Sequence, residues 1–365
     1  MLQRLGVGLG DAQTSPWRDW SHGLVAAHRE VFGSQVDEAW VRWKYGDGLG
    51  VGAGLWQEDA LAAFCGGVPR RLWWAGRSTR GLQITDVMVR AAWRQAGRRG
   101  GAFARVSTAL YAAALGECEP TATSGACVHS APFEVGYGFP SHRHLKLAVM
   151  LGLLRDGGAV TAAAWTAQAR PAAQALMRTH RRQTGALELE VLGPEAALEA
   201  AQHGWRRMRA DLTDHVVGDR GWAVLDWRYR RAPVVPGQGR VVFLGLRPAR
   251  LAAPVGVAVI RMAPQAVDQA DAHRDEPRRA MWLDWIGPAE MLGVAWAQGL
   301  DWALSAGATE LQGWFTDAPW ARLKGTSPAA ASEVARLGIP VAGRHDAREV
   351  TRHPWWMMAG DTDFL

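Results

Sequence analysis

Two halves of the sequence follow the same plan, and this repetition limits the possible folds more than any other feature. The segments AWVRWKYGDG (Ala39–Gly48) and VLDWRYRRAP (Val224–Pro233) both carry Trp, a basic residue and Tyr in the same order. In each half, glycine or proline and then short apolar runs typical of β-strands follow the segment. A repeat of this length is a domain rather than a solenoid unit. The sequence therefore predicts one fold used twice.

The apolar runs and the helical patterns come in the same order in both halves. Strands are expected at Val51–Trp56, Ala60–Val68, Arg71–Ala75 and Leu82–Val89, and again at Val241–Leu246, Val255–Met262 and Met281–Ile286. Apolar residues then recur every three or four positions, which predicts a helix in each half: Phe103, Val106, Leu110 and Ala114, then Met291, Ala295, Leu300 and Leu304. A further strand and helix follow: Glu134–Phe139 with Ser141–Leu151, and Glu310–Phe315 with Ala318–Leu337. This order predicts an α+β, or mixed α/β, domain that is present twice.

The domain boundaries follow from the repeat. We expect an N-terminal domain over residues 1–165 and a C-terminal domain over residues 186–365. Residues 166–185 (TAQARPAAQALMRTHRRQTG) are polar, rich in Arg and without an apolar face, so they are interpreted as a linker.

The composition is that of a globular protein with a proper core. The chain has 365 residues, 48% of them hydrophobic and 21% charged, which is enough for two domains. Its start does not resemble a signal peptide, and no run reaches the roughly 20 apolar residues that cross a bilayer. Three scattered cysteines, Cys65, Cys118 and Cys127, do not form a disulfide framework. We therefore expect a cytoplasmic protein without a membrane span.

The positive charge does not by itself indicate a nucleic-acid partner. The net charge is +6, and only Lys44, Lys146 and Lys324 among the 41 basic residues are Lys. The arginines are spread along the chain, whereas a nucleic-acid surface needs them clustered. We expect no DNA partner; the charge favours anionic ligands without selecting one.

Three stretches of the first half resemble a known family. ITDVMVRAAWR (Ile84–Arg94), QAGRRGGAF (Gln95–Phe103) and GYGFPSHRH (Gly136–His144) are similar to acyl-CoA N-acyltransferases of the GNAT superfamily. More narrowly, they resemble bacterial members with two tandem GNAT-like domains, and WWMMAGDTDFL (Trp355–Leu365) resembles the C-terminal strand of such proteins. The resemblance implies two domains, each a twisted, mostly antiparallel sheet flanked by helices. It also implies transfer of an acyl group, most simply from acetyl-CoA, to an amine.

The glycine-rich turn is the expected CoA site. A helix N-terminus offers free backbone N–H groups and a partial positive charge to a pyrophosphate, and nearby arginines add cations. In the family the preceding strand follows the pantetheine arm, and one of its N–H groups polarises the thioester carbonyl. The resemblance thus implies these cofactor-binding residues: Val87, Met88, Val89, Arg94, Gly97, Arg98, Arg99, Gly100, Gly101 and Ala102.

The sequence departs from the family pattern in three places. Arg99 falls where one reading of the loop requires a small residue, and Ala148 stands where many members carry the Tyr that protonates the departing thiolate. In the second half the corresponding junction, LDWIGPAEMLG, has Pro288 and no Arg. A proline removes a donor from such a loop. We therefore expect the second domain to be a sheet partner or substrate wall with a degenerate cofactor loop.

Acyl transfer to an amine needs a base, an oxyanion donor and an acid. Asp86, beside the expected thioester, is the first candidate base; it could equally be a carboxylate that anchors the backbone. Glu134, at the start of the next strand, is a second candidate. Tyr137 could supply the acid in place of the missing Tyr.

The corner GFPSHRH offers a further candidate in His144. Ser141 is expected to cap the helix, which explains that residue without any function. The cap does not explain His142, Arg143 and His144, because cations oppose the dipole at a helix N-terminus. The dipole lowers a His pKa, which suits a neutral base or donor. A structural polar cluster is the alternative.

Other activities stay open at this point. Cys127, His129, His142 and His144 could in principle hold zinc, but their spacing matches no metal motif, so we expect no metal. A non-catalytic pair of GNAT folds acting as a binding or scaffold protein is one alternative. A related tandem enzyme that transfers aminoacyl groups from tRNA is another. The acceptor, a small-molecule or peptide amine, and the oligomeric state are not indicated.

Overall fold

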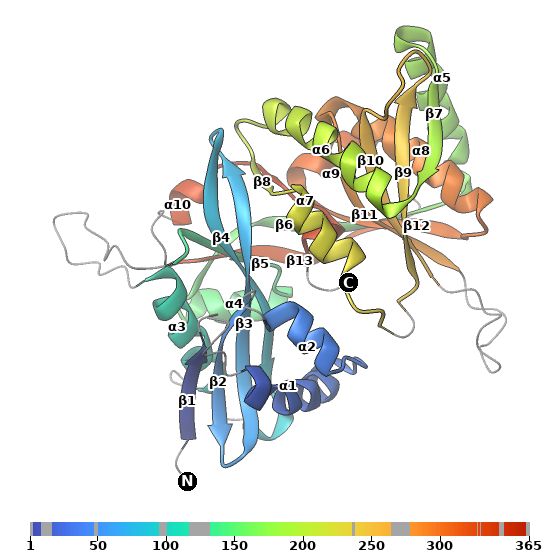
Figure 1. Cartoon of the computed structure of the whole chain (residues 1–365). Helices are drawn as coiled ribbons and strands as arrows, with labels where there is room; N and C mark the ends of the chain where they lie inside the picture. Colours follow the sequence, from blue (N-terminus) through green and yellow to red (C-terminus); the bar gives the residue numbers. More distant parts are fainter. Residues whose placement is uncertain are drawn as a thin grey trace, which may run out of the picture. The chain divides into compact units, whose positions relative to one another are not determined.

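The computed structural model describes residues 3–8, 17–46, 50–94, 101–116, 132–235, 238–263, 278–326, 328, 330–342 and 347–362. Within them the chain has the expected mixture of helices and strands (Figure 1). It divides into two compact units that are not contiguous in sequence. Unit 1 comprises Met1–Leu72, Ser78–Gly158 and Ala335–His353; unit 2 comprises Trp73–Arg77, Ala159–Val334 and Pro354–Leu365.

Unit 1 is built on a mixed sheet. Its strands are β1 (Gln3–Gly8), β2 (Val51–Gln57), β3 (Ala60–Trp74), β4 (Arg77–Val89), β5 (Val135–Gly138), the later part of β13 (Ala330–Pro340) and the start of β6 (Leu154–Thr166), adjacent in the order β1-β2-β3-β4-β5-β13-β6. Strand β2 pairs antiparallel with β1 and with β3, whereas β4 and β5 are parallel. Five helices belong to this unit: α1 (Trp17–Phe32), α2 (Glu38–Tyr45), α3 (Ala102–Leu115), α4 (His142–Met150) and α10 (Ala347–Val350).

The alternation of side chains along β2 and β3 places a core on each face of this sheet. Trp56 and Phe64 pack with α1 and α2, whereas their neighbours Leu55, Ala63 and Cys65 pack with α3 and α4. Figure 1 shows α1 and α2 together beside β2 and β3, with α3 on the other side. The sheet of unit 1 therefore lies between two helical layers.

Unit 2 is built on a largely antiparallel sheet. Its strands are the later part of β6, β7 (Leu187–Leu192), β8 (Val216–Gly218), β9 (Arg240–Pro248), β10 (Gly256–Met262), β11 (Arg279–Ile286), β12 (Glu310–Thr316) and β14 (Trp355–Trp356), with the main order β6-β12-β11-β10-β9-β7. Strands β11 and β12 are parallel, as β4 and β5 are in unit 1. The helices are α5 (Arg170–Thr184), α6 (Pro194–Asp211), α7 (Trp222–Leu225), α8 (Leu292–Ser305) and α9 (Asp317–Leu323).

Four sequence-based expectations differ from the structure. The two strands expected at 60–68 and 71–75 form the single strand β3. Residues 166–185, interpreted as a linker, contain α5, which packs against α8 and buries Ala173. The helix expected over Ala318–Leu337 ends at Leu323, and β13 begins at Ala330. Ala335, Leu337 and Ile339 are buried at every second position, which is the strand period. The expected C-terminal strand is only β14, and a short 3₁₀ turn follows it.

No helix in the described ranges is both long and apolar enough to span a bilayer.

Candidate active site

A bulge interrupts β4 at Asp86. Its backbone has φ of +46°, a left-handed conformation that few residues other than glycine adopt. As a result Thr85 and Asp86, although consecutive, both reach Tyr45 on the α1–α2 side. Ile84, Val87 and Val89 pack on the α3–α4 side instead. A bulge re-aims side chains in this way and is frequent beside active sites.

The side chain of Asp86 is the centre of a buried ionic cluster. Lys44 Nζ donates to Oδ2 at 2.7 Å, and the hydroxyl of Tyr45 donates to the same oxygen. His28 Nε2 lies 3.3 Å from Oδ1. Trp40 covers the group, since Lys44 Nζ is 4.5 Å from its ring centroid. These contacts hold the bulge in one conformation.

The cluster keeps Asp86 ionised. Burial alone would raise the pKa of Asp86, because it disfavours the charged form, but the charge of Lys44 and the contact with His28 outweigh burial and hold that pKa well below its usual range. The side chains of Lys44 and Asp86 are only 1% and 7% exposed. Asp86 was a candidate for the catalytic base or for a carboxylate that anchors the backbone. This geometry favours the anchoring role.

The end of β4 is fixed as well. Glu30 of α1 accepts from Arg90 Nε at 2.6 Å and from the backbone N–H of Ala91 at 3.0 Å. Arg94 turns back so that its Nε donates to the carbonyl of Val89 at 2.8 Å. The strand that would follow an acyl-CoA is therefore held on both sides of Val87–Val89.

Strands β4 and β5 part just before the bulge. Their pairs run from Gly81 with Val135 to Ile84 with Gly138, where β5 ends. Strand β4 continues through Asp86 to Val89. Of the proposed cofactor residues here, Met88 is buried on the α1–α2 side, whereas Val87 and Val89 are half-buried. The segment expected to contact the thioester thus begins where the pairing with β5 ends.

Helix α3 starts shortly after β4. Gly101 precedes its first residue, Ala102, and has no side chain with which to cap the helix. An anion could therefore use the N–H groups of the first turn. Gly97, Arg98, Arg99 and Gly100, the rest of the expected loop, lie outside the described residues.

The corner at Ser141 is a capped helix with one half-buried histidine. The hydroxyl of Ser141 accepts from the N–H of His144 at 3.3 Å, which confirms the expected cap. The ring of His144 packs edge to face on Phe103 of α3, with centroids 4.9 Å apart. Burial lowers the pKa of His144 to about 4. His142 and Arg143 are exposed.

The other two catalytic candidates are not near Asp86 in the register of the sheet. Glu134 accepts from the backbone N–H of Arg80 at 2.8 Å, at the opposite end of the β4–β5 pairing. Tyr137 pairs with Gln83 and is 1% exposed. Among the described residues no group of His, Cys, Asp and Glu has metal-binding geometry; Cys127 and His129 lie outside them.

Unit 2 carries a related cluster. Strand β11 has an irregular register after Trp282, and Asp284 follows it. Arg220 Nε donates to Asp284 Oδ1 at 3.1 Å and its Nη2 donates to Asp361 Oδ2 at 2.5 Å. The hydroxyl of Tyr229 lies 3.5 Å from Asp284 Oδ2. In both units the Tyr of the Trp-basic-Tyr segment thus contacts a buried Asp.

The helix start in unit 2 is occupied by the protein itself. Asp211 of α6 accepts from the backbone N–H of Ala289 at 3.1 Å, just ahead of α8. Trp285 Nε1 donates to the carbonyl of Pro288 at 2.9 Å. A carboxylate at this place satisfies the donor that a phosphate would need and repels an anion.

His28, Lys44 and Tyr45 were not predicted from the sequence as residues of the site. The signal was present, because the repeated Trp-basic-Tyr segment contains Lys44 and Tyr45. The partner of this segment could not be predicted, because Tyr45 and Asp86 are 41 positions apart and no local sequence pattern connects them.

Comparisons with known proteins give the fold. No family model matches the sequence, and no curated protein matches it significantly. Solved structures do match. A GCN5-related N-acetyltransferase from Anabaena variabilis aligns with a TM-score of 0.57 at 12% identity, over 92% of this chain and 72% of that one. One from Kribbella flavida aligns with a TM-score of 0.54 at 14% identity, over 92% and 71%.

A third match is a conserved protein of unknown function from Enterococcus faecalis, described as a probable N-acyltransferase. Its TM-score is 0.60 at 10% identity, over 94% of this chain and 74% of that one. Together these matches show that the chain has the fold of the GNAT superfamily, as the stretches around Asp86 and His144 suggested.

Proposed function

We propose that this protein is an N-acyltransferase that moves an acyl group, most simply acetyl, from acyl-CoA to a small-molecule or peptide amine. The observation that carries the proposal is the bulged end of β4: Asp86 turns the strand where β5 has ended, and α3 begins soon afterwards without a side-chain cap. The free end of β4 can offer a backbone N–H to a thioester carbonyl, and the uncapped start of α3 can offer N–H groups to a pyrophosphate.

In this reaction the amine nitrogen attacks the thioester carbonyl carbon, the C–N bond forms and the C–S bond breaks. A backbone N–H of Val87–Val89 would stabilise the oxyanion, and the start of α3 with Arg94, Arg98 and Arg99 would hold the pyrophosphate. Asp86, locked by Lys44, keeps the strand in position. It is a poor base, because its pKa is held low.

Three residues remain as candidates for proton transfer. His144 is neutral at pH 7, since burial lowers its pKa to about 4, so its ring can accept a hydrogen bond from the amine and orient it, but this low pKa makes it a weak base. Tyr137 is the proposed acid for the CoA thiolate, and Glu134 is a more distant base. The acceptor nitrogen loses two protons on its way from an ammonium to an amide. The CoA thiolate gains one of them and the other passes to solvent, and water can relay both.

Unit 2 is proposed to bind no CoA at its corresponding junction. Pro288 removes one donor there, and Asp211 already accepts from Ala289. We therefore expect each chain to bind one acyl-CoA.

The proposal is tested by following free thiol while acetyl-CoA and a panel of amines are added. Thiol release should require both substrates. In an Arg98→Glu/Arg99→Glu variant the affinity for CoA should fall about a hundredfold or more, because charge-assisted contacts to the pyrophosphate are lost and repulsion is added. Arg182→Glu/Arg206→Glu changes charge equally elsewhere and should bind CoA normally.

Two results would point to the alternatives. Binding of CoA without thiol release on any amine would favour a non-catalytic binding protein. Absence of CoA binding together with salt-dependent RNA binding would favour transfer from aminoacyl-tRNA.

A further inference from the structure

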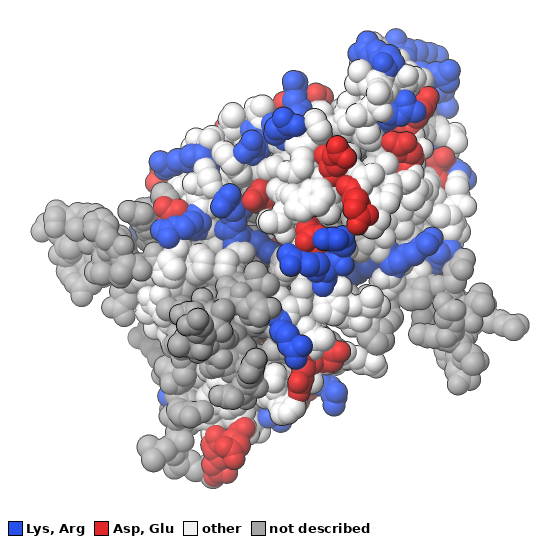
Figure 2. Space-filling model, viewed as in Figure 1, with Lys and Arg blue, Asp and Glu red and all other residues white. Residues whose placement is uncertain are grey.

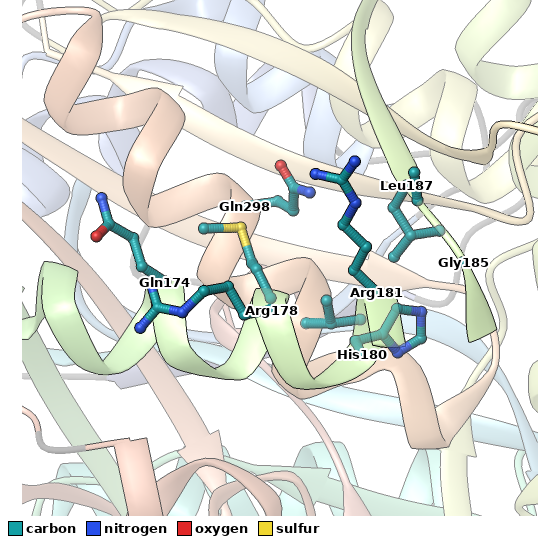
Figure 3. Close-up of a pocket in the computed structure, with 10 residues that line it drawn as sticks. Gln174, Arg178, His180, Arg181, Gly185, Leu187 and Gln298 are labelled. Carbon is teal, nitrogen blue, oxygen red and sulfur yellow. The ribbon is translucent and has the colours of Figure 1, made fainter. Parts of the chain in front are cut away.

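A hollow in unit 2 lies outside everything assigned to acyl transfer. Helices α5 and α8 and strand β7 surround it, and its volume is about 280 Å³ (Figure 3). The residues that matter for its chemistry are Gln174, Arg178, His180 and Arg181 of α5, Gln298 of α8 and Leu187 of β7. Because the residues of the proposed active site belong to unit 1, acyl transfer does not explain this hollow.

The polar lining consists mainly of hydrogen-bond donors. Arg178 and Arg181 contribute guanidinium groups, and Gln174 and Gln298 contribute amides that can turn a donor toward a ligand. In Figure 3 the side chains of Gln174, Arg178 and Arg181 rise from the same helix, with Gln298 on the helix behind them. No carboxylate lines the hollow. Such a lining suits an anion.

The positive charge here is not neutralised within the described part of the chain. Helix α5 contains no Asp or Glu. The nearest carboxylates along the neighbouring elements are engaged: Asp301 of α8 binds Arg170 at 2.7 Å, and Glu188, next to Leu187, binds Arg247. The guanidinium groups of Arg178 and Arg181 make no ion pair or hydrogen bond with a residue that the structure describes. Figure 2 shows basic side chains gathered where α5 lies in Figure 1.

The rest of the lining is apolar and the space is small. Met177, Val294 and Leu187 give the hollow a hydrocarbon surface beside the guanidinium groups. A volume near 280 Å³ lies at the lower end of small-molecule sites, which favours a compact ligand over a polymer. Arginine recognises phosphate through paired N–H groups.

We propose that the hollow between α5, α8 and β7 binds a small phosphate ester or diphosphate with an adjoining apolar group. Arg181 and Gln298 bind the phosphate of an ester, and Arg178 and Gln174 bind the second phosphate of a diphosphate (Figure 3). Met177, Leu187 and Val294 contact the apolar part. This inference does not depend on acyl transfer in unit 1.

Calorimetric titration of phenyl phosphate, inorganic pyrophosphate and inorganic phosphate into the full chain tests it. Phenyl phosphate should bind more tightly than inorganic phosphate, because it also buries an apolar ring. Arg178→Gln/Arg181→Gln should weaken binding of phenyl phosphate about tenfold or more. The control Arg182→Gln/Arg206→Gln removes the same charge outside the hollow and should leave binding within about twofold.

A second variant separates a defined site from general attraction. Gln174→Glu places a carboxylate in the lining at an exposed position, so the fold should be kept, as its thermal unfolding can verify, while phosphate binding should be lost. The proposal is overturned if none of the three probes binds. Equal weakening in the two double-Arg variants would overturn it too, and so would tight binding of an RNA oligonucleotide that all three variants weaken alike.

Discussion

Asp86 in unit 1 and Asp284 in unit 2 occupy matching places in the fold. Each lies on a strand that pairs in parallel with the next strand and is irregular near the Asp: β4 has a positive φ at Asp86, and β11 has a shifted register before Asp284. Each is approached by the Tyr of a Trp-basic-Tyr segment, Tyr45 or Tyr229. The repeated segment is therefore an anchor for a carboxylate on the central strand.

The two carboxylates differ in how their charge is balanced. Asp86 is paired with Lys44 of the repeated segment, and its pKa is held low in spite of burial. Asp284 shares Arg220 with Asp361, and burial, reinforced by Asp361, raises the pKa of Asp284 to about 6. The same local motif thus produces a permanent anion in one unit and a carboxyl that titrates near neutrality in the other.

The helix starts differ in a related way. Gly101 leaves the first turn of α3 without a side-chain cap, whereas Asp211 caps the start before α8 from within the protein. An external anion could use the free N–H groups at the start of α3, whereas Asp211 already accepts from one of those before α8. This difference is the basis for placing the acyl-CoA in unit 1.

The largest expected effect is that of Lys44→Met, which leaves Asp86 buried without its cation. Removing one partner of a buried ion pair costs about 3–5 kcal/mol of unfolding free energy. The double variant Lys44→Met/Asp86→Asn should recover much of this loss, and Asn tolerates the positive φ at this position. Urea unfolding at pH 7 measures the cycle, and amide exchange in β4 assigns the loss to unit 1. A loss below about 1 kcal/mol in Lys44→Met would contradict the cluster.

The next effect concerns pH and Asp284. Because its pKa is raised to about 6 in the folded state, the folded chain binds this proton more tightly than the unfolded chain. Stability should therefore fall as pH rises from about 4 to about 6 and then level off, by about 2 kcal/mol in total. The Asp284→Asn variant should lack this pH-dependent part of the unfolding free energy.

The unfolding free energies of wild type and Asp284→Asn between pH 4 and pH 7 measure the effect as a difference. Asp301→Asn, at a more exposed carboxylate of the same unit, serves as the control and should run parallel to wild type within about 0.5 kcal/mol. If the stability curve of Asp284→Asn ran parallel to that of wild type, the Asp284 carboxyl would not titrate in this range.

The smallest effect compares the two tyrosines. Tyr45 donates to an ionised Asp86, so Tyr45→Phe should cost about 2 kcal/mol. Tyr229 lies at a long 3.5 Å from Asp284, so Tyr229→Phe should cost less than about 1 kcal/mol. Thermal and urea unfolding of the two variants give the comparison. A larger cost for Tyr229→Phe would reverse the assignment of the stronger anchor to unit 1.

The sequence was informative where a local period decides the structure. The apolar runs that became β2, β4, β9 and β10 are continuous or alternate cleanly, so their positions could be predicted within a few residues. The stretch around Asp86 correctly indicated the GNAT fold.

The sequence was misleading where tertiary contacts decide. A polar, Arg-rich composition concealed α5, whose narrow apolar side rests on α8. The bulge at Asp86 could not be predicted, since strict alternation places Thr85 and Asp86 on opposite faces. Lys44 was visible as one of three lysines, but its burial against Asp86 depends on how α2 packs on the sheet.

The number of acetyl-CoA molecules bound per chain tests the central contrast most directly. Calorimetric titration of wild type should give one site, lost in Arg98→Glu/Arg99→Glu and kept in Asp211→Ala, because only the junction of unit 1 is open to a pyrophosphate. Two sites per chain, no site, or one site that survives Arg98→Glu/Arg99→Glu would contradict the account.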